Sequence, residues 1–437
     1  MKNKYQIIEL CIIFLLTLIF NLTCNTLTHD EVWNYGFAYN IANGLIPYKD
    51  FNMVITPLFP ILGAIFMTIF GKSLVIYHIF NAIICTWIFY YMKKNNSKSY
   101  YIPYSILLFN ALPNYNLFCI LLLYILMDME NKKTNDYLVG IFLGLTFLTK
   151  QNIGIYLCIP TIFVKNIKKI IKRMIGFVIP NIIMLIYLIL NNCLYEFIDY
   201  TFLGISDFAN KNLVLYSNCL LTTILITVYL IYKYIKTKDI KIVYLICFQG
   251  MAYPLIEPYH VILPFIVGFN YMLSNLNLSK RIIKYAFIIF ILCVYAYNIY
   301  IYMTDEYSYP NTTNVYKYKK INKNVCKSIE TIKDYIENQD GRIFIVDMYA
   351  YLVKLESNQT IDKFDLLNDG NLGSYGEKKI INEMDTICKK QKCTYLLNQV
   401  EIENEKYSQY NQDIYKYIVK NYKKTDSIIG LSVYTNY

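Results

Sequence analysis

Residues 165–190 read KNIKKIIKRMIGFVIPNIIMLIYLIL, a lysine-rich segment followed directly by a long apolar stretch. A helix of about 20 apolar residues crosses the hydrocarbon core of a bilayer. Basic residues gather on the cytoplasmic side of such helices. The same alternation of basic clusters and apolar runs recurs throughout the first 303 residues. The pattern is therefore typical of a multi-pass membrane protein.

The composition of the 437-residue chain agrees with this interpretation. Hydrophobic residues make up 56% of it and charged residues only 17%, whereas about 25% charged residues are usual in soluble domains. The net charge is +11, but most lysines of the first 300 residues lie between apolar runs, so no nucleic-acid partner is predicted. Three histidines exclude a His-rich metal site, and only Cys388 and Cys393 are close enough in sequence to suggest a disulfide.

The apolar runs predict about eleven transmembrane helices within residues 1–303. Two runs, 101–127 and 137–164, are too long for one plain span and short for two. Each has a polar centre, at 113–116 and 150–152, so both are interpreted as helical hairpins; single helices there would reduce the number to nine. The other runs lie at 7–20, 73–92, 174–190, 213–235, 240–254, 259–273 and 282–303.

Six basic clusters determine the predicted orientation. With eleven spans, all six fall on the cytoplasmic side together with the N-terminus, as the positive-inside rule requires. The outer face then carries the loops 25–72 and 191–212, the turn 255–259 and everything after Met303. The clusters lie at 2–4, 93–98, 132–133, 165–173, 233–241 and 280–284.

The composition changes near Thr304. Residues 304–437 are polar, and they combine helical patterns with the strand-like runs 342–347, 394–397 and 427–434. Such a mixture predicts a small α/β domain. The predicted fold is therefore an α-helical polytopic protein of the cell membrane with a small C-terminal extracytoplasmic α/β domain.

The outer loop 25–72 contains two short helical patterns, 32–43 and 57–70. Both are too short to span a bilayer, so we expect them to lie along its outer interface. The motif Thr28-His29-Asp30-Glu31 precedes the first of them. Its first and last residues fit a capping box, and acids suit the first turn of a helix. These acids therefore also have an ordinary structural explanation.

Further polar residues occur at predicted membrane depth or at outer turns. Lys150 is the only charge within 137–164, and Gln151 follows it. An ionisable residue inside a membrane is a functional candidate, although a lysine can also extend to the outer surface. Glu257-Pro258-Tyr259-His260 forms another outer turn, which is compatible with an ordinary polar turn. The predicted topology places all of these residues on the same face as Asp30.

The order of these motifs resembles the GT-C superfamily of membrane glycosyltransferases. Asp30-Glu31, then 43–51 (NGLIPYKDF) and 56–60 (TPLFP), is similar to the first outer loop of that superfamily. Residues 144–150 (GLTFLTK) are similar to a GLAFLTK segment of the bacterial branch related to protein O-mannosyltransferases and lipid A aminoarabinose transferase. Residues 259–264 (YHVILP) resemble a later outer motif of the same branch. The likeness covers about the first 270 residues.

The resemblance implies sugar transfer from a polyprenyl-phosphate-linked donor on the outer membrane face, usually with inversion. The implied acceptor is a hydroxyl of an envelope protein, polymer or glycolipid. Asp30 matches the general base, Asp50 falls where relatives carry a second acid, and Lys150 falls where they place a basic residue suited to the donor phosphate. The implied site consists of catalytic Asp30 with substrate-binding Glu31, Asp50, Lys150, Gln151, Tyr259 and His260.

One departure from the family bears on cofactors. Relatives often carry an acid at the outer start of the fourth span, where this chain has Asn114 and Asn116. No cofactor is predicted with certainty, and a divalent cation stays open. A Gly-rich nucleotide loop is missing from the sequence, which agrees with a lipid-linked donor.

Two other functions are compatible with the membrane pattern. In a transporter or flippase of lipid-linked sugars, Lys150 would belong to the translocation path; such proteins often contain two related halves, and the sequence has no such repeat. In a sensor or anchor, the spans would only display residues 304–437, for which eleven spans are excessive. The sequence therefore predicts a glycosyltransferase.

Overall fold

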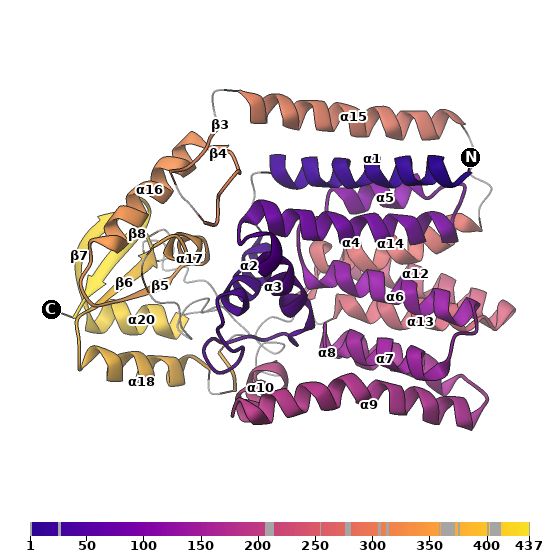
Figure 1. Cartoon of the computed structure of the whole chain (residues 1–437), viewed down its shortest axis with the longest axis horizontal. Helices are drawn as coiled ribbons and strands as arrows, with labels where there is room; N and C mark the ends of the chain where they lie inside the picture. Colours follow the sequence, from indigo (N-terminus) through magenta and orange to yellow (C-terminus); the bar gives the residue numbers. More distant parts are fainter. Residues whose placement is uncertain are drawn as a thin grey trace.

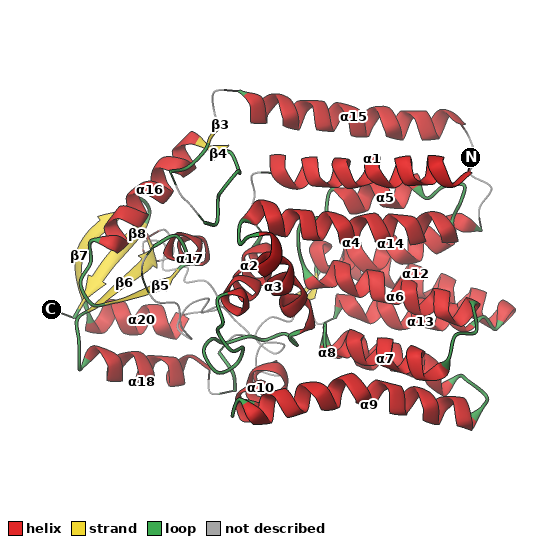
Figure 2. Ribbon diagram, in the orientation of Figure 1, coloured by secondary structure: helices red, strands yellow, loops and turns green. Residues whose placement is uncertain are grey.

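The computed structural model describes residues 2–24, 28–205, 214–253, 255–275, 281–304, 307–311, 314–357, 359, 372–374, 376–399, 402 and 412–436. Parts of the predicted loop 191–212 and of the basic cluster 280–284 lie outside these residues. Most of the described chain is helical, and the main sheet belongs to the C-terminal region (Figure 2).

The N-terminal two thirds of the chain form a bundle of helices that run side by side (Figure 1). Two shorter helices, α2 (His29–Ala42) and α3 (Leu58–Phe70), lie at the end of the bundle that faces the C-terminal region. The bundle helices are α1 (Lys2–Thr23), α4 (Leu74–Asn95), α5 (Tyr101–Leu108), α6 (Tyr115–Asn131), α7 (Asp136–Phe147), α8 (Gln151–Ile162), α9 (Ile167–Leu190), α12 (Ser217–Thr237), α13 (Ile240–Phe248), α14 (Pro258–Ser274) and α15 (Arg281–Met303). Short elements between them are α10 (Leu194–Ile198), the π-helix η1 (Asp199–Leu203), the 3₁₀-helix η2 (Gln249–Ala252) and the paired strands β1 (Val214–Leu215) and β2 (Leu255–Ile256).

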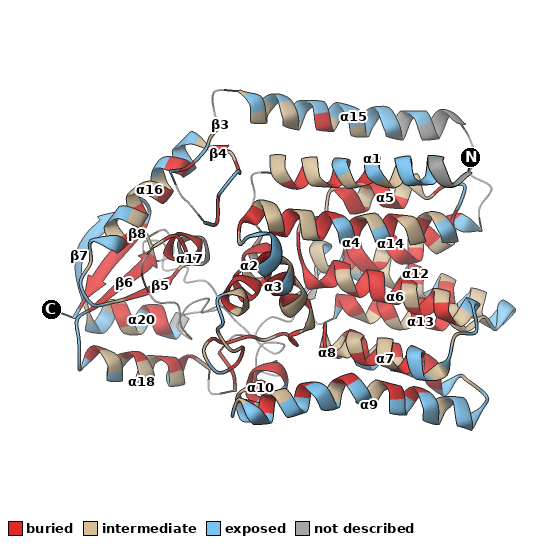
Figure 3. Ribbon diagram, viewed as in Figure 1, coloured by how far each residue is buried: buried red, intermediate tan, exposed pale blue. Residues whose placement is uncertain are grey.

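Within the described residues, four helices are long and apolar enough to cross a membrane: most of α1, and α4, α9 and α12. The outward face of α9 is exposed and apolar, with Ile175, Ile182 and Ile186 among its side chains (Figure 3). Such a face is favourable in lipid and unfavourable in water. The structure thus confirms a mostly helical chain with helices of spanning length, while the number of eleven spans stays a prediction.

Both predicted hairpins have a helix break at their polar centre. The first break separates α5 from α6, and the Asn114 side chain accepts a hydrogen bond from Leu117 N (3.1 Å), which caps α6. The second separates α7 from α8, with Lys150 at the N-cap position of α8. The first break has a local cause, because Pro113 and Asn114 favour helix ends and turns over helix interiors.

Ion pairs join the helix ends that carry basic clusters. Arg173 at the start of α9 binds Glu130 of α6 (2.6 Å) and Asp136 of α7 (2.9 Å). Lys93 of α4 pairs with Glu9 of α1 at the same end. The N-terminus lies at this end of the bundle, opposite the C-terminal region (Figure 1). The basic clusters at these helix ends are therefore gathered on one side of the bundle.

The C-terminal region contains a mixed sheet with the strand order β5-β6-β8-β7. Strands β5 and β6 are parallel and lie where the sequence predicted strands. The predicted strand 427–434 is instead a hairpin of β7 and β8, because Ile429 and Gly430 take positive φ values of 36° and 76° and turn the chain back. Cys388 and Cys393 form a disulfide. The elements are β3 (Tyr307–Ser308), β4 (Ile321–Asn322), α16 (Lys323–Glu337), β5 (Arg342–Val346), α17 (Met348–Lys354), α18 (Gly376–Cys388), β6 (Cys393–Asn398), α20 (Gln412–Asn421), β7 (Lys423–Ile428) and β8 (Leu431–Thr435).

Helices α2 and α3 differ from each other in burial. Helix α3 exposes apolar side chains such as Ile65 and Ile69, which is compatible with the predicted interfacial position. Helix α2 is buried on nearly all sides, because the C-terminal region covers it. Tyr351 donates a hydrogen bond to Asn40 Oδ1 (3.2 Å), and Tyr39 donates one to Leu355 O (3.4 Å). The expectation of an interfacial position therefore does not describe α2.

Candidate functional site

The first turn of α2 places the two adjacent acids. Thr28 occupies the N-cap, and its hydroxyl accepts a hydrogen bond from Glu31 N (3.2 Å). This is half of the predicted capping box. The other half is missing, because the Glu31 side chain binds His78 instead of the Thr28 backbone. The side chains of both acids therefore make their contacts outside the first turn of α2.

Asp30 is half-buried and belongs to a hydrogen-bonded chain of three side chains. The Tyr259 hydroxyl at the start of α14 donates to Asp30 Oδ2 (3.0 Å). The same hydroxyl accepts a hydrogen bond from Asn114 Nδ2 (3.2 Å) at the start of α6. Three segments far apart in the sequence therefore meet at one carboxylate.

Lys150 lies beside the segment of chain that also carries Asn114. Its ammonium donates a hydrogen bond to Asn116 Oδ1 (3.0 Å) and lies 5.2 Å from the centre of the Tyr115 ring. It is also within electrostatic range of Asp30. A cation over an aromatic ring, beside a buried amide and near a carboxylate, is held in place. These contacts argue against a lysine that merely extends to the membrane surface.

Glu31 points into the protein rather than toward Lys150. His78 Nε2 of α4 lies 2.6 Å from Glu31 Oε1, and both side chains are almost fully buried. Glu31 Oε2 and His78 Nδ1 have no hydrogen-bond partner in the described structure. Two further buried atoms nearby in sequence, Asn34 Oδ1 and Tyr77 Oη, also have none. Buried polar atoms are normally satisfied, so Glu31 Oε2 and His78 Nδ1 each have the capacity for one more polar partner.

The other predicted site residues make more local contacts. Asp50 accepts a hydrogen bond from Ile46 N (2.7 Å) and closes its own loop. Gln151 donates to Val54 O (3.3 Å) and Thr201 O (2.9 Å), which ties the outer loop to η1. His260 Nδ1 lies 2.8 Å from Glu257 Oε1, and this contact holds the pKa of Glu257 below its usual range. Of the seven predicted residues, the structure therefore groups Asp30, Lys150 and Tyr259 most directly.

The donor atoms around Asp30 do not suit a tightly bound divalent cation. Such ions prefer several carboxylate and carbonyl oxygens, whereas the Asp30 carboxylate accepts a hydrogen bond from a tyrosine hydroxyl, which itself binds an asparagine amide. Across the described part of the chain, no three His, Cys, Asp or Glu side chains are grouped as metal ligands. We therefore derive no chemical step from a metal.

Sequence reasoning missed several residues of this group. Asn114 and Asn116 were noted only as a departure from the family, yet they contact Tyr259 and Lys150. His78 was not selected at all. The sequence did offer one indication of it, because His78 is the only histidine within the apolar run 73–92.

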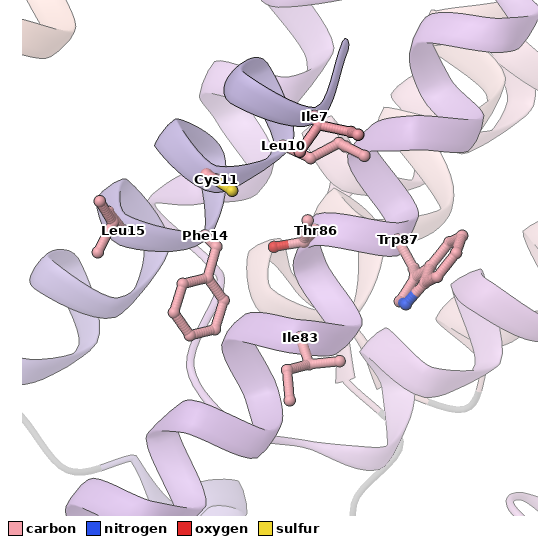
Figure 4. Close-up of a pocket in the computed structure, with 8 residues that line it drawn as sticks. All are labelled: Ile7, Leu10, Cys11, Phe14, Leu15, Ile83, Thr86 and Trp87. Carbon is pink, nitrogen blue, oxygen red and sulfur yellow. The ribbon is translucent and has the colours of Figure 1, made fainter. Parts of the chain in front are cut away.

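A separate apolar hollow lies between α1 and α4 (Figure 4). It has a volume of about 470 Å³, and Phe14, Leu15, Ile83 and Trp87 are among its lining residues. Thr86 supplies a hydroxyl, and no lining side chain carries a charge. The hollow suits a hydrocarbon chain and offers no acid or base, so it is distinct from the site around Asp30.

Comparisons with protein-family models, with curated proteins and with solved structures find no match to this chain.

Proposed function

We propose that the chain is an integral membrane glycosyltransferase. It moves a sugar from a polyprenyl-phosphate-linked donor to an acceptor hydroxyl on the outer face of the cell membrane. The observation that carries this proposal is that one segment, 114–116, connects the two charged groups: Asn114 binds Tyr259, which binds Asp30, and Asn116 binds Lys150. A carboxylate and a held ammonium in one group of side chains are the charges that such a transfer needs.

The proposed chemistry assigns one step to each charged group. The Asp30 carboxylate takes the proton of the acceptor hydroxyl as its oxygen bonds to the anomeric carbon of the sugar. The bond from that carbon to the phosphate oxygen breaks, and the electron pair leaves with the polyprenyl phosphate. The Lys150 ammonium stabilises the negative charge that develops there. Tyr259 holds Asp30 in position by its hydrogen bond.

The proposed topology has eleven spans and a cytoplasmic N-terminus. Its support is the gathering of basic helix ends on one side of the bundle, with the site and the C-terminal region on the opposite side. The Cys388–Cys393 disulfide also favours an extracytoplasmic C-terminal region, because disulfides persist in oxidising compartments.

The direct test is sugar transfer by the purified protein in detergent, with a set of polyprenyl-phosphate sugars as donors. We expect turnover by the wild type and a loss of about 10²- to 10⁴-fold in Asp30→Asn, because the amide cannot accept the proton. Asp426→Asn makes the same chemical change on exposed β7 and should keep wild-type turnover. If Asp30→Asn keeps more than about a tenth of the activity, Asp30 only supports the helix start. Donor transport across vesicles without transfer would instead favour a flippase.

A further inference from the structure

The buried carboxylate of Asp199 joins the membrane bundle to the C-terminal region. Asp199 is the first residue of the π-helix η1, and it is only 1% exposed. Its Oδ1 atom accepts hydrogen bonds from the backbone N–H (3.0 Å) and from the hydroxyl of Ser374, a residue of the C-terminal region. A carboxylate is costly to bury unless hydrogen bonds compensate for the lost water. The two hydrogen bonds from Ser374 therefore stabilise the buried carboxylate.

Two glycines bring the backbones of these segments into direct contact. Gly204 follows η1, and a methyl group on it would lie 2.8 Å from the carbonyl carbon of Gly373. A methyl group on Gly373 would lie 2.3 Å from Asp199 Oδ2. Gly373 also has a φ of 70°, a conformation that favours glycine over residues with a side chain. The contact between η1 and segment 372–374 therefore leaves no room for a side chain at either glycine.

The same π-helix contacts the residue that follows Lys150. Gln151 is the first residue of α8, and its Nε2 atom donates a hydrogen bond to Thr201 O of η1 (2.9 Å). Lys150 is the N-cap residue of α8, and its ammonium donates to Asn116 Oδ1 (3.0 Å). π-Helical turns are frequent at functional sites. Hydrogen bonds therefore connect segment 372–374 to η1, and η1 to the start of α8.

We infer that Asp199 is a positioning residue for Lys150: its contact with Ser374 holds η1, and η1 holds the start of α8 through Gln151. The catalytic consequence rests on the proposed function, in which Lys150 meets the donor phosphate. The C-terminal region is then an integral part of the donor site and not a separate displayed domain. The contact between Asp199 and Ser374 does not itself depend on which reaction the site performs.

A double-mutant cycle of melting temperatures tests this contact without any assay of activity. Asp199→Ala and Ser374→Ala should each lower the Tm of the full-length protein in detergent, because each removes one partner of the same hydrogen bonds. The double variant should lose less than the sum of the two losses. Ser427→Ala removes an exposed hydroxyl on β7, and its effect should simply add to that of Asp199→Ala. Additive losses for Asp199 and Ser374 would overturn the contact.

Kinetics test whether the contact positions Lys150. Asp199→Ala should raise the donor KM by about 5- to 20-fold, because a displaced ammonium loses part of its attraction to the phosphate. The acceptor KM should stay within about twofold of wild type. In a Lys150→Met background, Asp199→Ala should change the donor KM little further, since both changes act through the same ammonium. Asp199→Asn keeps an acceptor oxygen and should stay near wild type.

Two kinetic outcomes would overturn the positioning role. One is an unchanged donor KM in Asp199→Ala. The other is an effect of Asp199→Ala that is equally large with and without Lys150, because Asp199 would then act on the donor by another route. If the wild type transfers no sugar, the proposed function fails, and the melting cycle still decides whether Asp199 and Ser374 stabilise each other.

Discussion

At the scale of single residues, two neighbouring acids have opposite surroundings. Asp30 is half-buried and accepts a hydrogen bond from the Tyr259 hydroxyl, whereas Glu31 is 1% exposed and binds a buried histidine. In a helix, adjacent side chains point about 100° apart, so one turn can serve two different sites. Asp30 is therefore accessible to a substrate, and Glu31 is suited to holding the turn in place.

Lys150 provides the prediction at this scale. Lys150→Met keeps the length of the side chain and removes its charge, so we expect a raised donor KM and slower departure of the lipid phosphate. Lys150→Arg should keep partial activity, because a lysine acts on phosphate as a point charge without bidentate geometry. Steady-state kinetics with donor and acceptor varied separately measure both effects, with protein yield as the folding control. Unchanged donor parameters in Lys150→Met would show that the ammonium does not meet the phosphate.

At the scale of elements, the backbones of α7 and α9 lie closer together than they could if their facing glycines carried a Cβ atom. A methyl group on Gly140 would collide with the Arg173 carbonyl, and one on Gly176 would collide with the Tyr137 carbonyl. On Gly144 it would lie 2.5 Å from Pro180 Cγ. Small residues that let helix backbones approach are typical of packing within membranes.

We expect Gly140→Ala to destabilise the protein by about 1–3 kcal/mol, because the helices must separate to admit the methyl group. Gly268→Ala is the matched control. Its methyl group would meet a side-chain atom, Ile226 Cγ2, and not a backbone carbonyl. Thermal unfolding in the same detergent compares the two variants. Equal losses at both positions would contradict the close backbone contact between α7 and α9.

At the scale of the whole molecule, the candidate site lies between two parts of the chain. The bundle supplies Asp30, Lys150 and Tyr259, and the C-terminal region contacts α2, where Tyr351 binds Asn40. The basic helix ends lie at the far end of the bundle. One end of the bundle therefore carries basic helix ends, and the opposite end carries the candidate site.

The proposed topology predicts which positions react with a membrane-impermeant thiol reagent. Lys49→Cys and Asn324→Cys are exposed at the site end and should label in intact cells stripped of any outer barrier. Ser97→Cys and Thr237→Cys are exposed at the basic end and should label only after permeabilisation. The unsubstituted chain measures the background from its own free cysteines. Labelling of Ser97→Cys from outside would contradict the proposed orientation.

Several features of this protein follow from the sequence alone. The helices of spanning length, the breaks near 113–116 and 150–152 and the C-terminal strands all depend on hydropathy, periodicity and turn residues within short windows. These are local properties, so local reasoning found them. The prediction for residues 427–434 was wrong, because a pair of turn residues divides the single predicted strand into the two strands of a hairpin.

Only the tertiary structure decided which side chains meet. Tyr259 reaches Asp30 across 229 positions of sequence, and no periodicity reports that contact. The same holds for His78 and Glu31, which lie 47 positions apart in the sequence. Burial of α2 was also missed, because its cover comes from the C-terminal region. Side-chain partners depend on how distant helices pack, and hydropathy measures only whether a residue leaves water, not what it touches there.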